Sequence, residues 1–196
     1  MNTRKLITLT LISFLCIQCA IDRTVSPLSE IEVEKLAVFQ NLESKNKIQI
    51  CDENEIGQKL WLCLTVVSKE SEEPIINEEI KLYHTSTAGE YELTNPADPS
   101  SARLGGTVIT DEEGRVFVQT ILPGDYGSSA DNRHIHTTVN NARPDAYDIN
   151  FEQYTSTMGR NFINGSDQHF LANLKQTKDN VLVTFLTMEV KNWNSN

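Results

Sequence analysis

The sequence predicts an all-β protein, an antiparallel β-sandwich of about 7–9 strands with a short N-terminal helix or tether. From about residue 48 onward, short runs rich in β-branched and aromatic residues recur roughly every 8–12 residues. Turn-forming clusters such as Asp111 to Gly114, Pro123-Gly124 and Asn164-Gly165 separate these runs. Because no strong helical pattern lies between them, a sandwich is favoured over a sheet built from βαβ units.

The first eighteen residues are typical of an export signal, in which Arg4 and Lys5 precede an apolar run that ends at Ile17. Such a run is short for a membrane-spanning helix, which needs about 20 apolar residues. Cys19 stands where a bacterial lipoprotein signal places its lipidated cysteine. We therefore expect export to the bacterial cell envelope, with a lipid at Cys19 anchoring the protein in the periplasm or at the cell surface. Ordinary secretion, with Cys16 and Cys19 discarded, is the alternative.

Residues 19–47 are predicted to form a tether or helix, and residues 48–196 the sandwich. Ser29 is placed to cap a helix over Glu30 to Leu42, and polar residues 43–47 suit a linker. The expected strands are Lys59 to Val67, Glu79 to Tyr83, Gly106 to Thr110, Val116 to Ile121, His134 to Val139, Asp148 to Gln153 and Val181 to Val190.

Charge and cysteine content narrow the possible functions. A formal net charge of −10 argues against nucleic acid as a partner, because binding a phosphate backbone requires clustered Lys and Arg. An exported compartment permits Cys51 and Cys63 to form a disulfide. The alternative is that Cys63, within an apolar stretch, is a small buried hydrophobic residue.

A candidate metal site begins with His134-Ile135-His136. On a strand, side chains two residues apart point to the same face, so both imidazoles can bind one ion. This pattern alone is weakly specific. A strand that ends in Pro123-Gly124-Asp125-Tyr126 precedes it, and the turn places a tyrosine at the rim shortly before the two histidines.

These segments, Thr120 to Tyr126 followed by His134-Ile135-His136, resemble those of intradiol ring-cleavage dioxygenases. An upstream segment from Pro74 to Tyr91, with Asn77, Tyr83-His84 and Gly89 at its fixed positions, also matches the family pattern. Arg103 to Gly105 and Thr110 to Phe117 are similar to the family's intervening region. The resemblance covers about residues 58 to 190.

The resemblance implies an enzyme that holds Fe(III) through Tyr91, Tyr126, His134 and His136, with Tyr126 and His136 axial. Phenolates are hard anionic donors that favour Fe(III), and neutral imidazoles complete the set. The implied substrates are a small catechol-type molecule and O2, and the ring is cut between its two hydroxyls. No other cofactor is implied, and Tyr126 would accept a substrate proton on leaving the iron.

The chain departs from the family pattern at two positions. Asp131 stands where active members usually carry an arginine, and Arg133 is the nearest replacement, although strand alternation would point it away from His134. Asp148 stands where a glutamine is usual, unless a shifted register brings Gln153 there. Carboxylates beside a catecholate would disfavour it electrostatically. The departures place turnover in question more than iron binding.

Two other histidines are interpreted differently from the candidate ligands. His84 is expected to be a structural residue near the site, and His169 is assigned no role. The alternative function is an exported β-sandwich that binds a catechol or carbohydrate and has lost catalysis, because the Thr110 to Tyr126 segment also describes a simple hairpin and turn. A Ser-His-Asp hydrolase is disfavoured, because no G-x-S-x-G motif is present.

Overall fold

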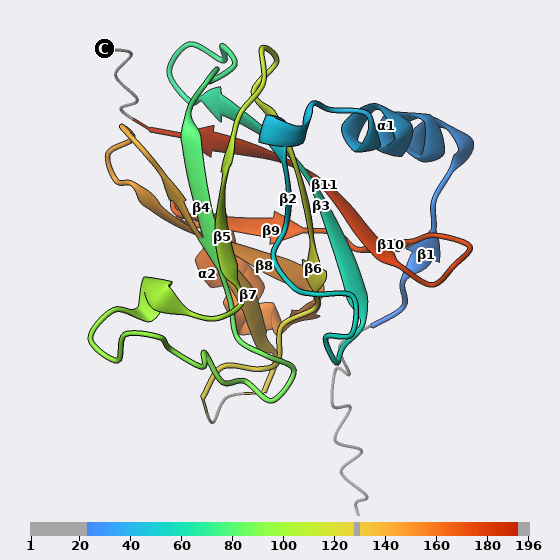
Figure 1. Ribbon diagram of the computed structural model, residues 1–196, viewed down its shortest axis with the longest axis vertical. Coiled ribbons are helices and arrows are strands. Elements are labelled where there is room, and N and C mark those ends of the chain that lie inside the picture. The colour runs from blue at the N-terminus through green and yellow to red at the C-terminus, as the bar shows by residue number, and fades with distance from the viewer. Residues whose placement is uncertain (1–22, 128–129, 192–196) are drawn as a thin grey trace, which may run out of the picture.

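The computed structural model describes residues 23–127 and 130–191, which fold into two packed sheets. One sheet has six strands in the order β1-β10-β11-β3-β6-β2, and the other has five in the order β5-β4-β7-β8-β9. Figure 1 shows the two layers with helix α1 beside the six-stranded sheet and α2 behind β7 and β8 of the other sheet. The β-sandwich predicted from the sequence is confirmed.

The seven strands expected from the sequence are all present, with ends shifted by at most two residues. They are β3 (Lys59–Ser68), β4 (Glu79–Tyr83), β5 (Gly105–Ile109), β6 (Arg115–Ile121), β7 (Asn132–Val139), β8 (Ala146–Thr155) and β11 (Leu182–Val190). Four shorter strands and one helix were not anticipated: β1 (Ser26–Pro27), β2 (Lys47–Gln49), β9 (His169–Ala172), β10 (Lys175–Gln176) and α2 (Thr157–Asn164). Strands of two to four residues are too short to show a recognisable alternation.

Strand direction is more mixed than the sequence suggested. Among the described strands, five pairings are antiparallel and four are parallel. The longest parallel pair joins β11 to β3, with Leu182 opposite Leu60 and Val190 opposite Ser68. Pairing between strands far apart in the chain depends on topology, which the alternation within each strand does not encode.

The main core lies between the sheets and follows strand alternation. Leu60, Leu62, Leu64 and Val66 of β3 are completely buried and belong to the cluster that joins the two sheets. Trp61, Cys63 and Thr65 alternate with them and so face the outer side of the six-stranded sheet. The other sheet follows the same rule, with Ile80 and Leu82 of β4 facing inward.

Helix α1 (Glu30–Gln40) covers part of that outer side. Ser29 caps it as predicted, since its hydroxyl accepts a hydrogen bond from the Glu32 backbone N–H while the Glu32 carboxylate accepts one from the Ser29 N–H. Leu36 and Phe39 pack against a second cluster that includes Cys63. Cys51 and Cys63 are both free and form no disulfide with each other. Cys63 is a small buried hydrophobic residue, which was the alternative to the disulfide.

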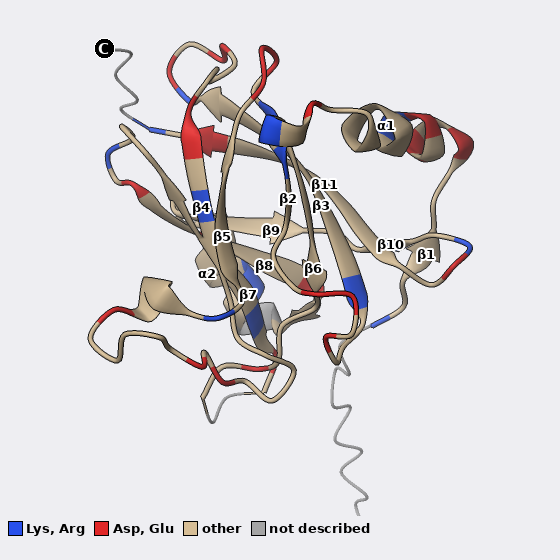
Figure 2. Ribbon diagram, in the orientation of Figure 1, with Lys and Arg blue, Asp and Glu red and all other residues tan. Residues whose placement is uncertain are grey.

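Charged residues are spread unevenly over the described ribbon. Figure 2 shows Asp and Glu on α1 and on loops at both ends of the sandwich, while Lys and Arg are scattered over several elements. In the part of the chain that the structure describes, neither helix is long and apolar enough to cross a membrane. Cys19 and the expected signal segment lie outside the described residues.

Candidate metal centre

The candidate site lies on the outer face of the five-stranded sheet. Ile135, Thr137 and Val139 of β7 are buried toward the core, so alternation turns His134 and His136 outward. Strand register places Tyr83 of β4 opposite His136. The rings of Tyr83 and His136 stack with centroids 4.8 Å apart and planes at 28°. The face that carries the histidines is therefore also lined by an aromatic ring.

Two loops bring the tyrosines over this face. Tyr91 lies in the connection between β4 and β5, and Tyr126 in the connection between β6 and β7. The loops meet backbone to backbone at Gly124, whose N–H donates to the Ser86 carbonyl over 2.9 Å. A Cβ at Gly124 would lie 2.5 Å from the Thr87 carbonyl oxygen and 2.6 Å from the Gly89 nitrogen. Only glycine permits this approach, which explains a glycine two residues before each tyrosine.

His84 ties together the strands from which the two loops depart. It is fully buried, and its Nδ1 lies 2.8 Å from the Thr85 carbonyl oxygen while its Nε2 lies 2.6 Å from the Thr120 hydroxyl. A carbonyl only accepts, so Nδ1 carries the proton and Nε2 accepts from Thr120. Burial lowers the pKa of His84 to about 4, although the Thr85 hydrogen bond and Glu55 oppose this shift. His84 is thus a structural residue at the base of the site.

The four side chains predicted to hold a metal lie together. The Tyr91 hydroxyl is 2.7 Å from His136 Nε2, and the two Nε2 atoms of His134 and His136 are 3.2 Å apart. The Tyr126 ring lies 5.4 Å from the Tyr91 ring and 6.1 Å from the His134 ring, measured between centroids. Tyr126 is 46% exposed. The donor atoms of Tyr91, His134 and His136 therefore converge, and the Tyr126 ring lies beside them.

Hydrogen bonds at the far side of each imidazole determine which nitrogen can bind a cation. His134 Nδ1 lies 3.0 Å from the Asn132 carbonyl oxygen, and His136 Nδ1 lies 2.7 Å from Asp148 Oδ1. Since both partners are acceptors, both Nδ1 atoms carry protons, and in the neutral rings both Nε2 atoms present lone pairs. Two lone pairs 3.2 Å apart repel each other, and a cation between them would relieve that repulsion. The donor set fits a metal ion.

The local electrostatics also favour the neutral form of His134. Burial lowers the pKa of His134, and the neighbouring His136 adds to the effect. Burial raises the pKa of the Tyr91 phenol, with further contributions from Tyr126, Tyr83 and Asp148. Without a cation Tyr91 therefore keeps its proton and donates a hydrogen bond to His136 Nε2. A bound trivalent cation would reverse this preference by stabilising the phenolate.

Asp148 and His169 join this cluster from strands β8 and β9. Burial opposes ionisation of Asp148, but the hydrogen bond from His136 and the nearby imidazoles lower its pKa overall. His169 Nδ1 lies 3.4 Å from Asp148 Oδ2. No role was assigned to His169 from the sequence. Only the pairing of β8 with β9 sets His169 beside Asp148, and the pairing of strands is not visible in the amino-acid sequence.

His134, His136 and Asp148 offer a second possible donor set, with one ligand atom each within 4.8 Å. The Asp148 oxygen, however, accepts from the Nδ1 side of His136, whereas Tyr91 and His134 meet the ring at Nε2. One ion bound at Nε2 would therefore be held by the tyrosines, with Asp148 behind the ring. Gln153 does not occupy the position where the family usually has a glutamine. It is buried, and its side chain is hydrogen-bonded to the Leu174 backbone.

Asp131, whose negative charge was expected to oppose a catecholate, has a positively charged partner, and Arg133 lies near the same loop. Asp131 pairs with Arg23 at 2.6 Å, an interaction across 108 positions of sequence. Arg133 does not follow the alternation assumed for it, because the register between β7 and β8 shifts between Asn132 and His134. Its guanidinium lies over the Tyr154 ring at 4.3 Å, and its Nε is 3.6 Å from Asp125, the residue before Tyr126. Arg133 thus borders the loop that carries Tyr126.

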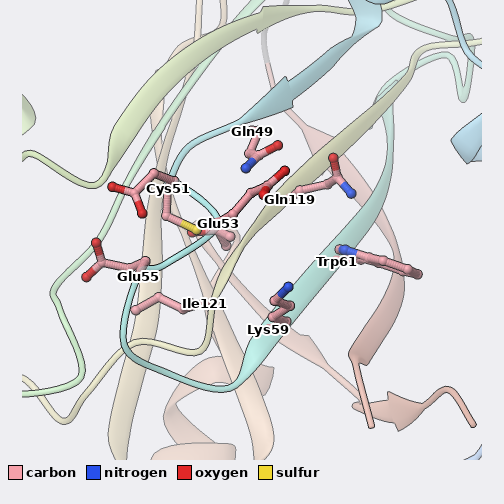
Figure 3. Close-up of a pocket in the computed structure, with 10 residues that line it drawn as sticks. Gln49, Cys51, Glu53, Glu55, Lys59, Trp61, Gln119 and Ile121 are labelled. Carbon is pink, nitrogen blue, oxygen red and sulfur yellow. The ribbon is translucent and has the colours of Figure 1, made fainter. Parts of the chain in front are cut away.

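A separate pocket of about 180 Å³ lies where β2, β3 and β6 meet the loop after β2. Figure 3 shows Gln49, Gln119, Lys59 and Trp61 around it, with Cys51 at one side. None of the four candidate metal ligands lines this pocket. It is therefore distinct from the metal centre.

Comparison with known proteins gives a consistent picture. A family model described as "Dioxygenase" matches residues 38–192. The catechol 1,2-dioxygenase of Acinetobacter baylyi is 36% identical over 55 residues, which cover 28% of this chain and 18% of that enzyme. The matched region therefore spans less than a fifth of the length of that curated relative.

Solved structures share the fold. An intradiol ring-cleavage dioxygenase from Tetranychus urticae superposes with a TM-score of 0.56 at 21% identity, covering 79% of this chain and 92% of that one. The dioxygenase domain of a dioxygenase carbohydrate-binding protein fusion from Streptomyces sp. SirexAA-E gives 0.55 at 16% identity, covering 76% and 92%. At these identities the structural likeness shows the fold alone.

Proposed function

Because the chain belongs to the intradiol ring-cleavage dioxygenase family, we propose that it is a non-haem Fe(III) enzyme that cleaves catechol-type rings between the two hydroxyls. O2 is the co-substrate. Tyr91, Tyr126, His134 and His136 are the proposed ligands. The observation that carries the proposal is the convergence of the two Nε2 lone pairs, 3.2 Å apart, with the Tyr91 hydroxyl 2.7 Å from one of them.

The two tyrosines have different roles in this proposal. Tyr91 is half-buried, its ring packs between those of Tyr83 and Tyr126, and it remains in place, whereas Tyr126 is 46% exposed on a loop. Tyr126 can therefore swing outward when a catechol arrives and accept one of its protons at the phenol oxygen. A ferric ion, when bound, supplies the site for both catechol oxygens and makes the ring reactive toward O2.

Arg133 is proposed as the cation that supports the reacting ring. Its guanidinium is anchored over Tyr154 and borders the Tyr126 loop through Asp125. Asp131, which occupies the position where an arginine was expected, is matched by Arg23. The pairing reduces the repulsion that Asp131 would exert on a catecholate dianion, so it favours binding of the substrate.

The second candidate is a module that binds a catechol, or a carbohydrate, without turnover. The observation that favours it is the salt bridge between Arg23 and Asp131, which neutralises the carboxylate without placing a free arginine there. The two candidates share the fold and separate only at the reaction step. Product formation therefore distinguishes them.

The deciding experiment is a visible spectrum with iron quantified on the same sample, for protein expressed without residues 1–19 and mixed with catechol in air. A tyrosinate-to-Fe(III) band that shifts with catechol and gives way to ring-opened product supports the enzyme. A band that shifts without product supports the catechol-binding module. Colourless protein without iron contradicts the metal proposal and leaves a metal-free binding module.

We also propose that the protein is exported to the cell envelope and anchored through a lipid at Cys19. The support is the sequence of the first nineteen residues, with a basic start, a short apolar run and a cysteine at the expected place. Metabolic labelling with palmitate should mark the parent and not a Cys19→Ala variant. Equal labelling of both proteins would contradict the assignment.

A further inference from the structure

Four side chains form one row across the five-stranded sheet. Register places Tyr83 opposite His136, His136 opposite Asp148, and Asp148 opposite His169, so that the row crosses β4, β7, β8 and β9. Directly opposed residues on one face lie close enough for their side chains to interact. The row thus connects a proposed ligand to two residues outside the proposed donor set.

Each step along the row has a contact. His136 Nδ1 donates to Asp148 Oδ1 over 2.7 Å, and the other carboxylate oxygen lies 3.4 Å from His169 Nδ1. The His169 ring packs edge-on against Phe162 of α2, with centroids 5.0 Å apart. On the opposite side of His136, the Tyr83 ring stacks against the imidazole. His136 is therefore held at its Nδ1 and on one ring face.

We propose that Asp148 is a positioning residue that keeps His136 in the tautomer with its proton on Nδ1, and that His169 holds the second oxygen of Asp148. A carboxylate behind an imidazole fixes the ring orientation and makes the opposite nitrogen a stronger ligand for a metal ion. Through His169 and Phe162, the row connects His136 to helix α2, which belongs to neither of the loops that carry Tyr91 and Tyr126. The role of Asp148 in metal affinity rests on the proposed function, whereas its role in setting the tautomer does not.

The strand itself supplies a matched control. Glu152 lies four residues after Asp148 on β8, alternates to the same face, and is paired with Arg160 rather than with a candidate ligand. Glu152→Gln therefore removes a carboxylate from the same strand without affecting His136. Asp148→Asn removes the charge but keeps an acceptor oxygen, and Asp148→Ala removes both.

The first measurement uses the metal-free full chain with ¹⁵N-labelled histidine at pH 8, where long-range ¹H–¹⁵N correlations report the tautomer of each imidazole. We expect the Nδ1–H form at His136 in the parent, in Asp148→Asn and in Glu152→Gln. Asp148→Ala should give a mixture that includes the Nε2–H form. A parent with Nε2–H at His136, or an unchanged tautomer in Asp148→Ala, would overturn the proposal.

The second measurement is Fe(III) affinity by competition with a chelator, together with the wavelength of the tyrosinate band. Loss of a group that supports a metal ligand lowers affinity about 10–100-fold, which is the effect expected for Asp148→Ala. Asp148→Asn and His169→Gln should show smaller losses, and Glu152→Gln none. If Asp148→Ala bound Fe(III) as tightly as the parent, the proposal that Asp148 strengthens metal binding through His136 would be overturned.

The two measurements separate failure of this inference from failure of the proposed function. If the parent binds no iron, the proposed function fails, while the tautomer of His136 still decides whether Asp148 positions it. If the parent binds iron and the tautomer does not depend on Asp148, only the present inference fails. Thermal unfolding of every variant shows whether a loss of affinity reflects a loss of fold.

Discussion

The two outer faces of the sandwich obey the same alternation but serve different purposes. On the six-stranded sheet, register aligns Phe185, Cys63 and Phe117, and Phe39 of α1 packs over this row. On the five-stranded sheet, the corresponding row carries Tyr, His, Asp and His, and it meets the Tyr91 loop at His136 and helix α2 at His169. An apolar row covered by a helix contributes stability through burial, whereas a polar row beside a loop remains accessible to a ligand.

The largest expected effects come from one substitution on each face. Phe39 is 2% exposed, and Phe39→Ala should reduce the free energy of unfolding by about 3–5 kcal/mol through lost burial and a cavity. His134→Ala should abolish iron binding while changing stability much less. Urea denaturation and iron content, measured on both variants, test this separation. Iron retained in His134→Ala would show that the ligand assignment is wrong.

The histidine beneath the site should make stability depend on pH. His84 has a folded pKa of about 4, below its ordinary value of 6.5, so the unfolded chain binds the extra proton between these values. The stability that it contributes is complete above pH 6.5 and decreases as the pH falls toward 4, by about 3 kcal/mol in all. Urea denaturation across this interval should give a flatter profile for His84→Gln than for the parent. Identical slopes would exclude His84 as the cause.

Backbone contact between the two loops should be necessary for the site. Gly124→Ala should displace both loops, since its Cβ would meet backbone atoms, and we expect at least tenfold weaker iron binding, a loss of about 1.4 kcal/mol. Gly165→Ala is the matched control, because its Cβ would meet atoms no closer than 3.6 Å and its φ of −93° is ordinary. Chelator competition compares the two. Equal affinities would mean that the loop contact is dispensable.

The smallest expected change in iron content follows from the more exposed tyrosine. Tyr126→Phe should retain part of the iron, because three proposed ligands remain, but should lose most of the visible colour and activity. The reason is that a phenolate donor and proton acceptor are both removed. Absorbance per bound iron is the measurement. Colour and activity like those of the parent would remove Tyr126 from the proposed site.

Much of the site could be predicted because its signals are local. His134 and His136 are two residues apart on one strand, and the turn at Pro123-Gly124 fixes where Tyr126 emerges. The seven longer strands were predictable for the same reason, since alternation is read within a single segment. The four short strands and α2 carry too little local pattern to be recognised.

The sequence by itself determined the sandwich, the strands that carry the histidines and the donor residues that the structure brings together. Only the tertiary structure decided which residues surround those donors. It paired Asp131 with Arg23, set His169 beside Asp148, buried Gln153 and laid α1 over Cys63. The physical reason is that periodicity is a property of each segment, whereas contacts between distant strands depend on register and topology fixed by packing of the whole core.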